Sequence, residues 1–230
     1  MSRLNNTTRG PLLCYVTDRS SLPEFESQKA QGALLSKIEA AAASGVDWIQ
    51  IREKDLSGRD CALLTREALQ RAVKSPASNG APVRILVNGR LDVAFSERAG
   101  GIHLGETSLP LPETKRFITN RGELEDFVIG VSCHSWEAAK SAASDGADYL
   151  FFGPVFATPW KAAFGAPQGL ERLREVCRAV SIPVVAIGGI TLANAPDCLA
   201  AGSSGIAAIR LFQDARDMSS LVQSLRKQAR

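Results

Sequence analysis

Three polar side chains alternate along one short, otherwise apolar stretch of this chain, and together they suit a multiply charged anion. Gln50, Arg52 and Lys54 occupy every second position of residues 48–54. An extended strand turns alternate side chains to opposite faces, so we expect the three to share one face. Burying two cations without a counterion is costly, and an exposed sheet edge is the plain alternative. We therefore interpret this face as a ligand-binding surface.

Two later stretches end in residues that suit a phosphate group. One apolar run ends in Gly188 and Gly189, and the last run ends in Ile209 and Arg210. Glycine lets a backbone approach a ligand closely, and N–H groups at a helix N-terminus attract anions, so we expect Thr191 to cap a helix that begins there. A tight turn alone would also explain the glycines. We predict that the two glycines, the isoleucine and the arginine bind phosphate.

Other polar side chains also follow apolar runs. Asn88, Ser132 and His134 end two of these runs, and Thr158 and Lys161 stand in a long loop rich in glycine, proline and alanine. A loop of this length in a compact domain is typical of a lid or a binding loop. We therefore include all five among the candidate site residues.

Strands and helices must alternate along the chain to position these residues. The apolar pattern predicts eight strands, at residues 12–18, 48–54, 83–88, 101–105, 127–134, 149–155, 183–187 and 205–210. Helical patterns follow them, at residues 33–43, 59–73, 91–98, 113–119, 135–144, 170–180, 193–201 and from 218 onwards. This alternation indicates an α/β protein with a parallel sheet, a single-domain (β/α)8 TIM barrel. The carboxyl ends of its strands form the catalytic face, where the polar residues fall.

Composition limits the classes of partner. The chain has 230 residues, 45% of them hydrophobic, and a formal net charge of +3 without a basic cluster beyond Arg226-Lys227. This charge fits a weak preference for anionic small molecules, and it indicates neither nucleic acid nor a membrane as a partner. Five cysteines without a CxxC pair favour free thiols in a reducing cytoplasm over disulfides or zinc. Residues 1–10 are polar, so we expect a disordered tail before a single domain at 11–230, and no signal peptide.

With these residues in view, the chain resembles the thiamine phosphate synthase/TenI family over nearly its whole length. The matching segments are residues 15–18, 50–54, 87–94, 101–105, 130–138, 146–149, 152–158 and 187–190. Each segment is weakly specific alone, and their shared order makes the resemblance strong. It implies a barrel enzyme of thiamine biosynthesis, a transferase that joins a pyrimidine methyl diphosphate to thiazole phosphate and releases diphosphate.

The resemblance also implies roles for the candidate residues. Diphosphate would be held by Gln50, Arg52, Lys54 and Lys161, and its pocket would also be lined by Asn88 and Ser132. Thr158 and Gly189 would meet the thiazole or its phosphate. The residues with catalytic roles would be Arg52, Lys54, Ser132, His134 and Lys161. Fixed cations stabilise a leaving diphosphate most in the transition state, which agrees with these roles.

The metal site departs from the family pattern. Family synthases hold Mg²⁺ on the diphosphate with two aspartates, and the corresponding residues here are Gly89 and Ser108. Glu106 lies close in sequence and is the candidate to replace them, so magnesium stays an open expectation. Arg210 also replaces a small residue of the family's phosphate site.

Three alternatives to the synthase remain. The first is a TenI-like thiazole tautomerase, an isomerase that needs no metal and uses a histidine at the place of His134. The second is a non-catalytic binding or regulatory barrel, and the third is a Schiff-base aldolase that uses Lys54 or Lys161. We expect His103 to be structural. The sequence leaves a homodimer open.

Overall fold

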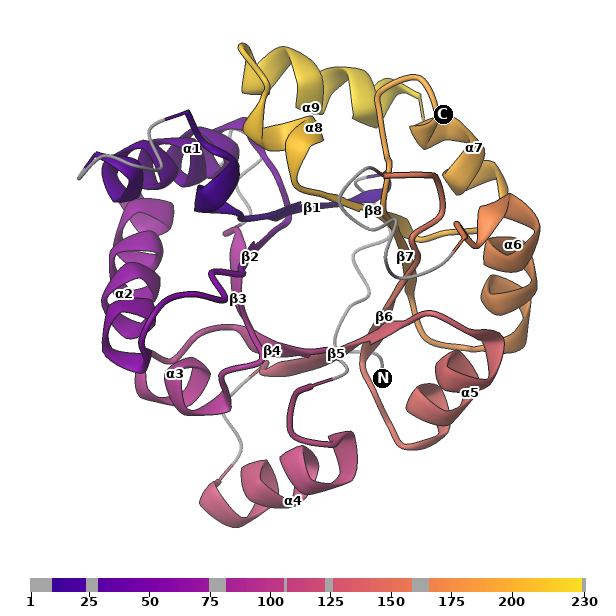
Figure 1. The fold of residues 1–230 in the computed structure, drawn as a ribbon, viewed down its shortest axis with the longest axis horizontal. Helices are drawn as coiled ribbons and strands as arrows, with labels where there is room; N and C mark the ends of the chain where they lie inside the picture. The colour runs from indigo at the N-terminus through magenta and orange to yellow at the C-terminus, as the bar shows by residue number, and fades with distance from the viewer. Residues whose placement is uncertain are drawn as a thin grey trace.

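The strands of the computed structural model form a closed barrel, which confirms the predicted TIM-barrel fold (Figure 1). The structure describes residues 10–23, 29–74, 82–105, 107–122, 126–158 and 166–228. The strands, each parallel to both neighbours, are β1 (Leu12–Val16), β2 (Trp48–Ile51), β3 (Arg84–Asn88), β4 (Gly101–Leu104), β5 (Val128–Cys133), β6 (Tyr149–Phe152), β7 (Val184–Ile187) and β8 (Gly205–Ala208). Because β8 pairs with β1, all eight carboxyl ends open at one mouth.

Helices surround the barrel on its outer side (Figure 1). They are α1 (Ala30–Ser44), α2 (Gly58–Lys74), α3 (Leu91–Ser96), α4 (Leu111–Arg121), α5 (Trp136–Ser144), α6 (Gly169–Ala179), α7 (Ala195–Ala200), α8 (Arg210–Gln213) and α9 (Met218–Lys227). A short 3₁₀ turn, η1 (Arg19–Ser21), follows β1. At α5 the side chain of Ser135 accepts from the Ala138 N–H, so this helix begins where its capping residue predicts.

Buried side chains form two sets, one inside the barrel and one between the strands and the helices. The inner set consists of Cys14, Val16, Trp48, Leu86, Val128, Tyr149, Phe151, Val185 and Ala207. These residues alternate along their strands with the outer set, as the period of a strand requires. The inner set therefore fills the barrel below its mouth with apolar side chains, and we call it the apolar plug. Polar side chains lie toward the mouth.

Several predicted element ends are wrong. β1 ends at Val16 and β2 at Ile51, earlier than residues 18 and 54. The helix after β7 begins at Ala195, and its N-cap is Asn194 instead of Thr191. Thr191 contacts this residue in a turn, since its Oγ1 accepts from the Asn194 N–H at 3.3 Å. The N–H groups of α7 are thus displaced along the chain from the two glycines.

The cysteines and the termini bear on the compositional predictions. All five cysteines are free, and all but Cys177 are buried. Among the described residues, no helix combines the length and apolar character that crossing a membrane requires. Residues 1–9 lie outside the described residues, so the disordered tail remains a prediction.

Candidate active site at the mouth of the barrel

The three polar residues of β2 and of the turn after it differ in their surroundings. Gln50 points into the barrel and is 1% exposed, and its Nε2 has no hydrogen-bond partner among the described residues. Arg52 is partly buried and Lys54 is exposed. A buried donor without a partner is costly, which makes the Gln50 amide a candidate donor to a ligand. Lys54, however, lines a cavity together with Ile51 and Glu53, which the strand pattern placed on the other face. Because β2 ends at Ile51, the predicted alternation does not extend to Lys54.

A buried carboxylate fixes the turn that carries these cations. Glu53 accepts from the Thr17 hydroxyl at 2.6 Å and from the Arg19 N–H at 2.9 Å. The Thr17 Oγ1 in turn accepts from the Arg52 N–H at 3.0 Å. Burial raises the pKa of Glu53, and the bonds from Thr17 and Arg19 oppose that shift. The carboxyl ends of β1 and β2 are therefore joined by hydrogen bonds next to Arg52 and Lys54.

A cavity of about 290 Å³ opens beside this turn. Its polar side chains lie at or after the ends of β2, β3 and β4, and they are the carboxylate of Glu53 together with Lys54, Asn88, Arg90, Thr107 and Ser108. The Arg90 guanidinium pairs with the Asp92 carboxylate, with Nε at 2.9 Å from Oδ1. The cavity thus brings together two of the residues predicted to bind diphosphate, Lys54 and Asn88.

Ser132 lies at the mouth on top of a buried polar chain. The His103 Nε2 is 2.8 Å from the Ser132 Oγ, and the His103 Nδ1 is 3.1 Å from the Tyr149 hydroxyl. Burial, aided by the positive charge of Arg52, lowers the pKa of His103 to about 3. The imidazole is therefore neutral at physiological pH, and the effect of Arg52 places its charge near this group.

His134 follows β5 and contacts the end of β6. Its Nδ1 donates to the carbonyl oxygen of Gly153, so a neutral imidazole carries its proton on Nδ1. The Gly153 N–H donates to the Cys133 oxygen at 3.3 Å. The His134 ring is thus held by the backbone where β5 and β6 end, within the predicted catalytic face.

Gly188 and Gly189 follow β7 in a conformation that favours glycine. Their φ angles are +98° and +66°, in the left-handed region. A Cβ on Gly188 would lie 2.6 Å from the Pro154 Cα, and one on Gly189 would lie 2.7 Å from the Ala157 oxygen. The loop after β6 therefore packs directly on these glycines. Thr158, partly exposed, follows in the same loop.

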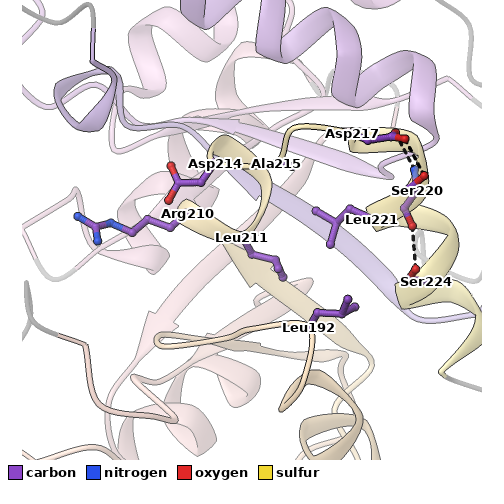
Figure 2. A pocket seen from close by; sticks show the side chains of 9 residues that line it. All are labelled: Leu192, Arg210, Leu211, Asp214, Ala215, Asp217, Ser220, Leu221 and Ser224. Carbon is purple, nitrogen blue, oxygen red and sulfur yellow. Dashed lines mark hydrogen bonds between the residues drawn. The ribbon is translucent and has the colours of Figure 1, made fainter.

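Arg210 is not joined to the glycines by any described contact. Ile209 packs on the inner apolar set, and Arg210 begins α8 with an exposed side chain. Arg210 lines a groove of about 430 Å³ on the outer side of α8 and α9, together with Leu192 and Leu221. Its side chain extends on the side of Asp214, away from Ser220 of α9 (Figure 2). Its predicted phosphate contact stays a prediction.

The described residues do not fit a magnesium site. A Cβ on Gly89 would lie 3.3 Å from the Ser108 Oγ, so the two positions that hold aspartates in family synthases are adjacent here. Neither is a carboxylate, and the Ser108 Oγ accepts from the Gly105 N–H at 2.9 Å. The described part of the chain contains no group of three His, Cys, Asp or Glu residues that could hold a metal. Mg²⁺ binds through oxygen ligands that include one or two carboxylates.

Two predicted site residues, Glu106 and Lys161, lie outside the described residues, so their roles stay predictions. Conversely, the sequence reasoning missed the contacts of Thr17, Glu53 and Tyr149. The buried contacts of Glu53 had a signal in the sequence, since this residue places a carboxylate on the apolar face of a predicted strand.

Comparison with known proteins gives consistent results. A family model described as thiamine monophosphate synthase matches residues 14–212. A thiamine-phosphate synthase of Methanocella arvoryzae is 45% identical over 186 residues, 81% of this chain and 82% of that protein. One of Chloroflexus aurantiacus is 40% identical over 213 residues, 92% of this chain and 90% of that protein. The solved structure of a thiamine phosphate pyrophosphorylase from Pyrococcus furiosus superposes with a TM-score of 0.78 at 32% identity, covering 96% of both chains.

Proposed function

Because the chain belongs to the thiamine monophosphate synthase family, we propose that it joins a pyrimidine methyl diphosphate to thiazole phosphate and releases diphosphate. It is an enzyme of the transferase class. In this reaction the thiazole nitrogen forms a bond to the methylene carbon of the pyrimidine. The bond from that carbon to the diphosphate oxygen breaks, and its electron pair leaves with the diphosphate.

The observation that carries the proposal is the set of donors at the ends of β2, β3 and β5. Gln50 presents a buried amide without a described partner, and Lys54 and Asn88 line one cavity. The Arg52 backbone is held by the clamp, the name we give to the hydrogen bonds of Thr17 with the Arg52 N–H and with Glu53. Fixed donors of this kind stabilise a diphosphate more strongly as its negative charge grows, which lowers the barrier to its departure.

The roles of individual residues are part of the proposal. We assign the diphosphate to Gln50, Arg52, Lys54, Asn88, Ser132 and Lys161, and the thiazole phosphate to Thr158, Gly188, Gly189, Ile209 and Arg210. The positive φ of the two glycines supports the second assignment, because it lets the backbone N–H groups approach a phosphate. Magnesium enters no step here, because the described residues do not fit it.

A tautomerase is the second candidate, and two observations favour it. Positions 89 and 108 lack carboxylates although they are adjacent, and His134 has its Nδ1 fixed by the Gly153 carbonyl. A neutral imidazole with one nitrogen fixed can take up a proton at the other, which suits proton transfer on a thiazole phosphate.

The test is to incubate the protein with both synthase substrates, with and without Mg²⁺, and to measure thiamine phosphate and diphosphate. We expect equal amounts of the two products, and an activity at least tenfold lower for Arg52→Ala, the effect of losing about 1.4 kcal/mol of transition-state binding. Arg172→Ala is the matched control, because Arg172 is an exposed residue of α6 whose side chain pairs with Glu175. Absence of both products under either condition would rule out the synthase.

We also propose the cellular location, the substrate class and the oligomeric state of the enzyme. Five free thiols favour a cytoplasmic location, because disulfides rarely persist in reducing compartments. We propose phosphorylated small molecules as its substrates and a homodimer as its assembly, which analytical ultracentrifugation can measure.

A further inference from the structure

A chain of three hydrogen-bonding side chains leads from the apolar plug to the barrel mouth. Tyr149 of β6, His103 of β4 and Ser132 of β5 contact one another in that order, at 3.1 Å and 2.8 Å. The first two are 0% and 1% exposed, whereas Ser132 is partly exposed. The proposed diphosphate ligand Ser132 is therefore backed by two fully buried groups.

The barrel is built to hold this chain in place. Gly130 lies beside Tyr149 in the register of β5 and β6, and a Cβ there would lie 2.0 Å from a carbon of the tyrosine ring. The centroid of the Tyr149 ring lies 4.6 Å from that of Trp48, and the centroid of the His103 ring lies 4.3 Å from that of Phe151. The rings cannot turn without disturbing the plug, so the positions of the polar atoms are fixed.

The protonation states follow from burial. Burial lowers the pKa of His103 to about 3 and raises the pKa of Tyr149 well above its usual value. Both side chains are therefore neutral at physiological pH, and a neutral imidazole has one donor and one acceptor nitrogen.

The direction of the hydrogen bonds is set at the buried end. Within the described part of the chain, the Tyr149 hydroxyl has His103 Nδ1 as its hydrogen-bond partner. A buried O–H that fails to donate is costly, so Tyr149 donates to Nδ1. The proton of the imidazole then lies on Nε2, which donates to the Ser132 oxygen. The hydroxyl proton of Ser132 cannot point back at His103, and it turns to the mouth.

We propose that His103, held in one tautomer by Tyr149, is a positioning residue that directs the Ser132 hydroxyl proton toward an anionic oxygen of the bound diphosphate. This inference rests on the proposed function, which places the diphosphate at Ser132. In the other tautomer Ser132 would donate to Nε2 and present only oxygen lone pairs, which repel an anion.

The test uses inorganic pyrophosphate as the probe and calorimetry as the readout. We expect Tyr149→Phe to weaken pyrophosphate binding about three- to tenfold, because Ser132 is then free to donate to His103. In a Ser132→Ala background the same substitution should have no further effect. Tyr15→Phe is the matched control, because Tyr15 is also fully buried but its hydroxyl donates to Gln213 instead. It should bind pyrophosphate like the wild type.

A second measurement does not depend on the variants. Nitrogen-15 NMR of the wild type reports which imidazole nitrogen carries the proton, and the chain has two histidines to distinguish. We expect Nδ1 of His103 to be unprotonated and Nε2 protonated. A protonated Nδ1 overturns the inference.

The outcomes separate the inference from the proposed function. Normal binding by Tyr149→Phe, beside weakened binding by Ser132→Ala, overturns the inference and leaves the diphosphate site in place. Unchanged binding by Ser132→Ala removes the diphosphate from Ser132 and overturns the inference alone. No pyrophosphate binding by the wild type overturns the proposed diphosphate site as well as the inference. A loss that is equal in the wild-type and Ser132→Ala backgrounds reveals a merely structural role and also overturns the inference.

Discussion

At the scale of single residues, one group of side chains supplies positive charge to the site, and another sets the direction of a hydrogen bond. Arg52 and Lys54 supply positive charge at the mouth, while His103 stays neutral because it is buried and lies near Arg52. A charged imidazole at His103 would be costly to desolvate and would be repelled by Arg52. The imidazole can therefore contribute orientation without contributing charge.

The neutral state of His103 predicts a pH dependence of stability. Its folded pKa of about 3 lies below the ordinary value of 6.5, so between these values the unfolded chain binds a proton that the native chain does not. Stability should rise with pH across this window, by at most about 1.4 kcal/mol per pH unit, and level off above it.

Urea unfolding of the wild type and His103→Gln between about pH 4.5 and 7 measures this effect. The wild type should lose stability relative to the variant as the pH falls, since the amide does not titrate. His134 is present in both proteins and cancels in the comparison. Parallel curves would mean that His103 is protonated equally in the folded and unfolded states.

The metal question is also decided by single residues. Gly89→Asp with Ser108→Asp would place two carboxylates side by side, because a Cβ on Gly89 lies 3.3 Å from the Ser108 Oγ. We expect Mg²⁺ to raise the melting temperature of the double variant and to raise its synthase activity, since carboxylates supply the ligands that Mg²⁺ prefers. The φ of Gly89 is +69°, where aspartate is tolerated better than most residues, at about 1 kcal/mol.

Gly89→Asn with Ser108→Asn is the matched control, because it has the same shape and backbone cost without the charges. It should show no response to Mg²⁺. A folded Asp variant that responds no more than the Asn variant would show that these two positions cannot form a metal site. If neither gains synthase activity and His134→Ala abolishes tautomerisation, the isomerase becomes the better assignment.

At the scale of elements, the ends of neighbouring strands are fastened to each other before they reach the site. Thr17 follows β1 and Glu53 follows β2, and their 2.6 Å bond also involves the Arg52 backbone through Thr17. Thr17 is 0% exposed and Glu53 is 8% exposed, so both side chains depend mainly on protein partners for their hydrogen bonds. The position of Arg52 thus depends on two strands together.

Thr17→Val tests this clamp with little change of shape. We expect a loss of about 1–3 kcal/mol in the free energy of unfolding, because the Arg52 N–H and the Glu53 carboxylate each lose a buried partner. Pyrophosphate binding should weaken as well, because the Arg52 backbone is released. The control is Thr65→Val, since the buried Thr65 hydroxyl donates within α2, to the Cys61 oxygen at 2.8 Å. Equal binding by the two variants would show that the clamp serves stability alone.

The elements also show what the sequence can predict. The alternation of Gln50 with its apolar neighbours depends on the local period of a strand, so its direction into the barrel was predictable. The bonds of Thr17 to Glu53 and of Tyr149 to His103 depend on the register between strands, which no local pattern contains. Thr191 failed as a cap because a turn of three residues precedes α7, and such a turn has no strong signal in this sequence.

At the scale of the whole molecule, closure of the barrel places two sets of residues on opposite arcs of one mouth. The first arc, β2 to β5, presents Gln50, Arg52, Lys54, Asn88 and Ser132. The second, β6 to β8, presents the loop with Thr158 and the glycines after β7. A transferase needs two substrates side by side, and the two arcs would hold the diphosphate of one and the phosphate of the other.

This arrangement predicts that two anions stabilise the protein independently. Pyrophosphate should raise the melting temperature, and phosphate added to saturating pyrophosphate should raise it further, because each ligand binds only the folded state. Arg52→Ala should lose the response to pyrophosphate and keep a response to phosphate. Gly189→Ala should do the reverse, because its Cβ would lie 2.7 Å from the Ala157 oxygen and displace the loop on the second arc.

Each shift is measured from the melting temperature of the same variant without ligand, so a general loss of stability does not affect the comparison. The controls are Arg172→Ala on the surface of α6 and Gly32→Ala in α1, where nothing lies within 4 Å of the added Cβ. Both should keep both responses. If Arg52→Ala or Gly189→Ala removes both responses at once, the mouth holds one shared anion site, and the closed barrel does not divide its substrates between two arcs.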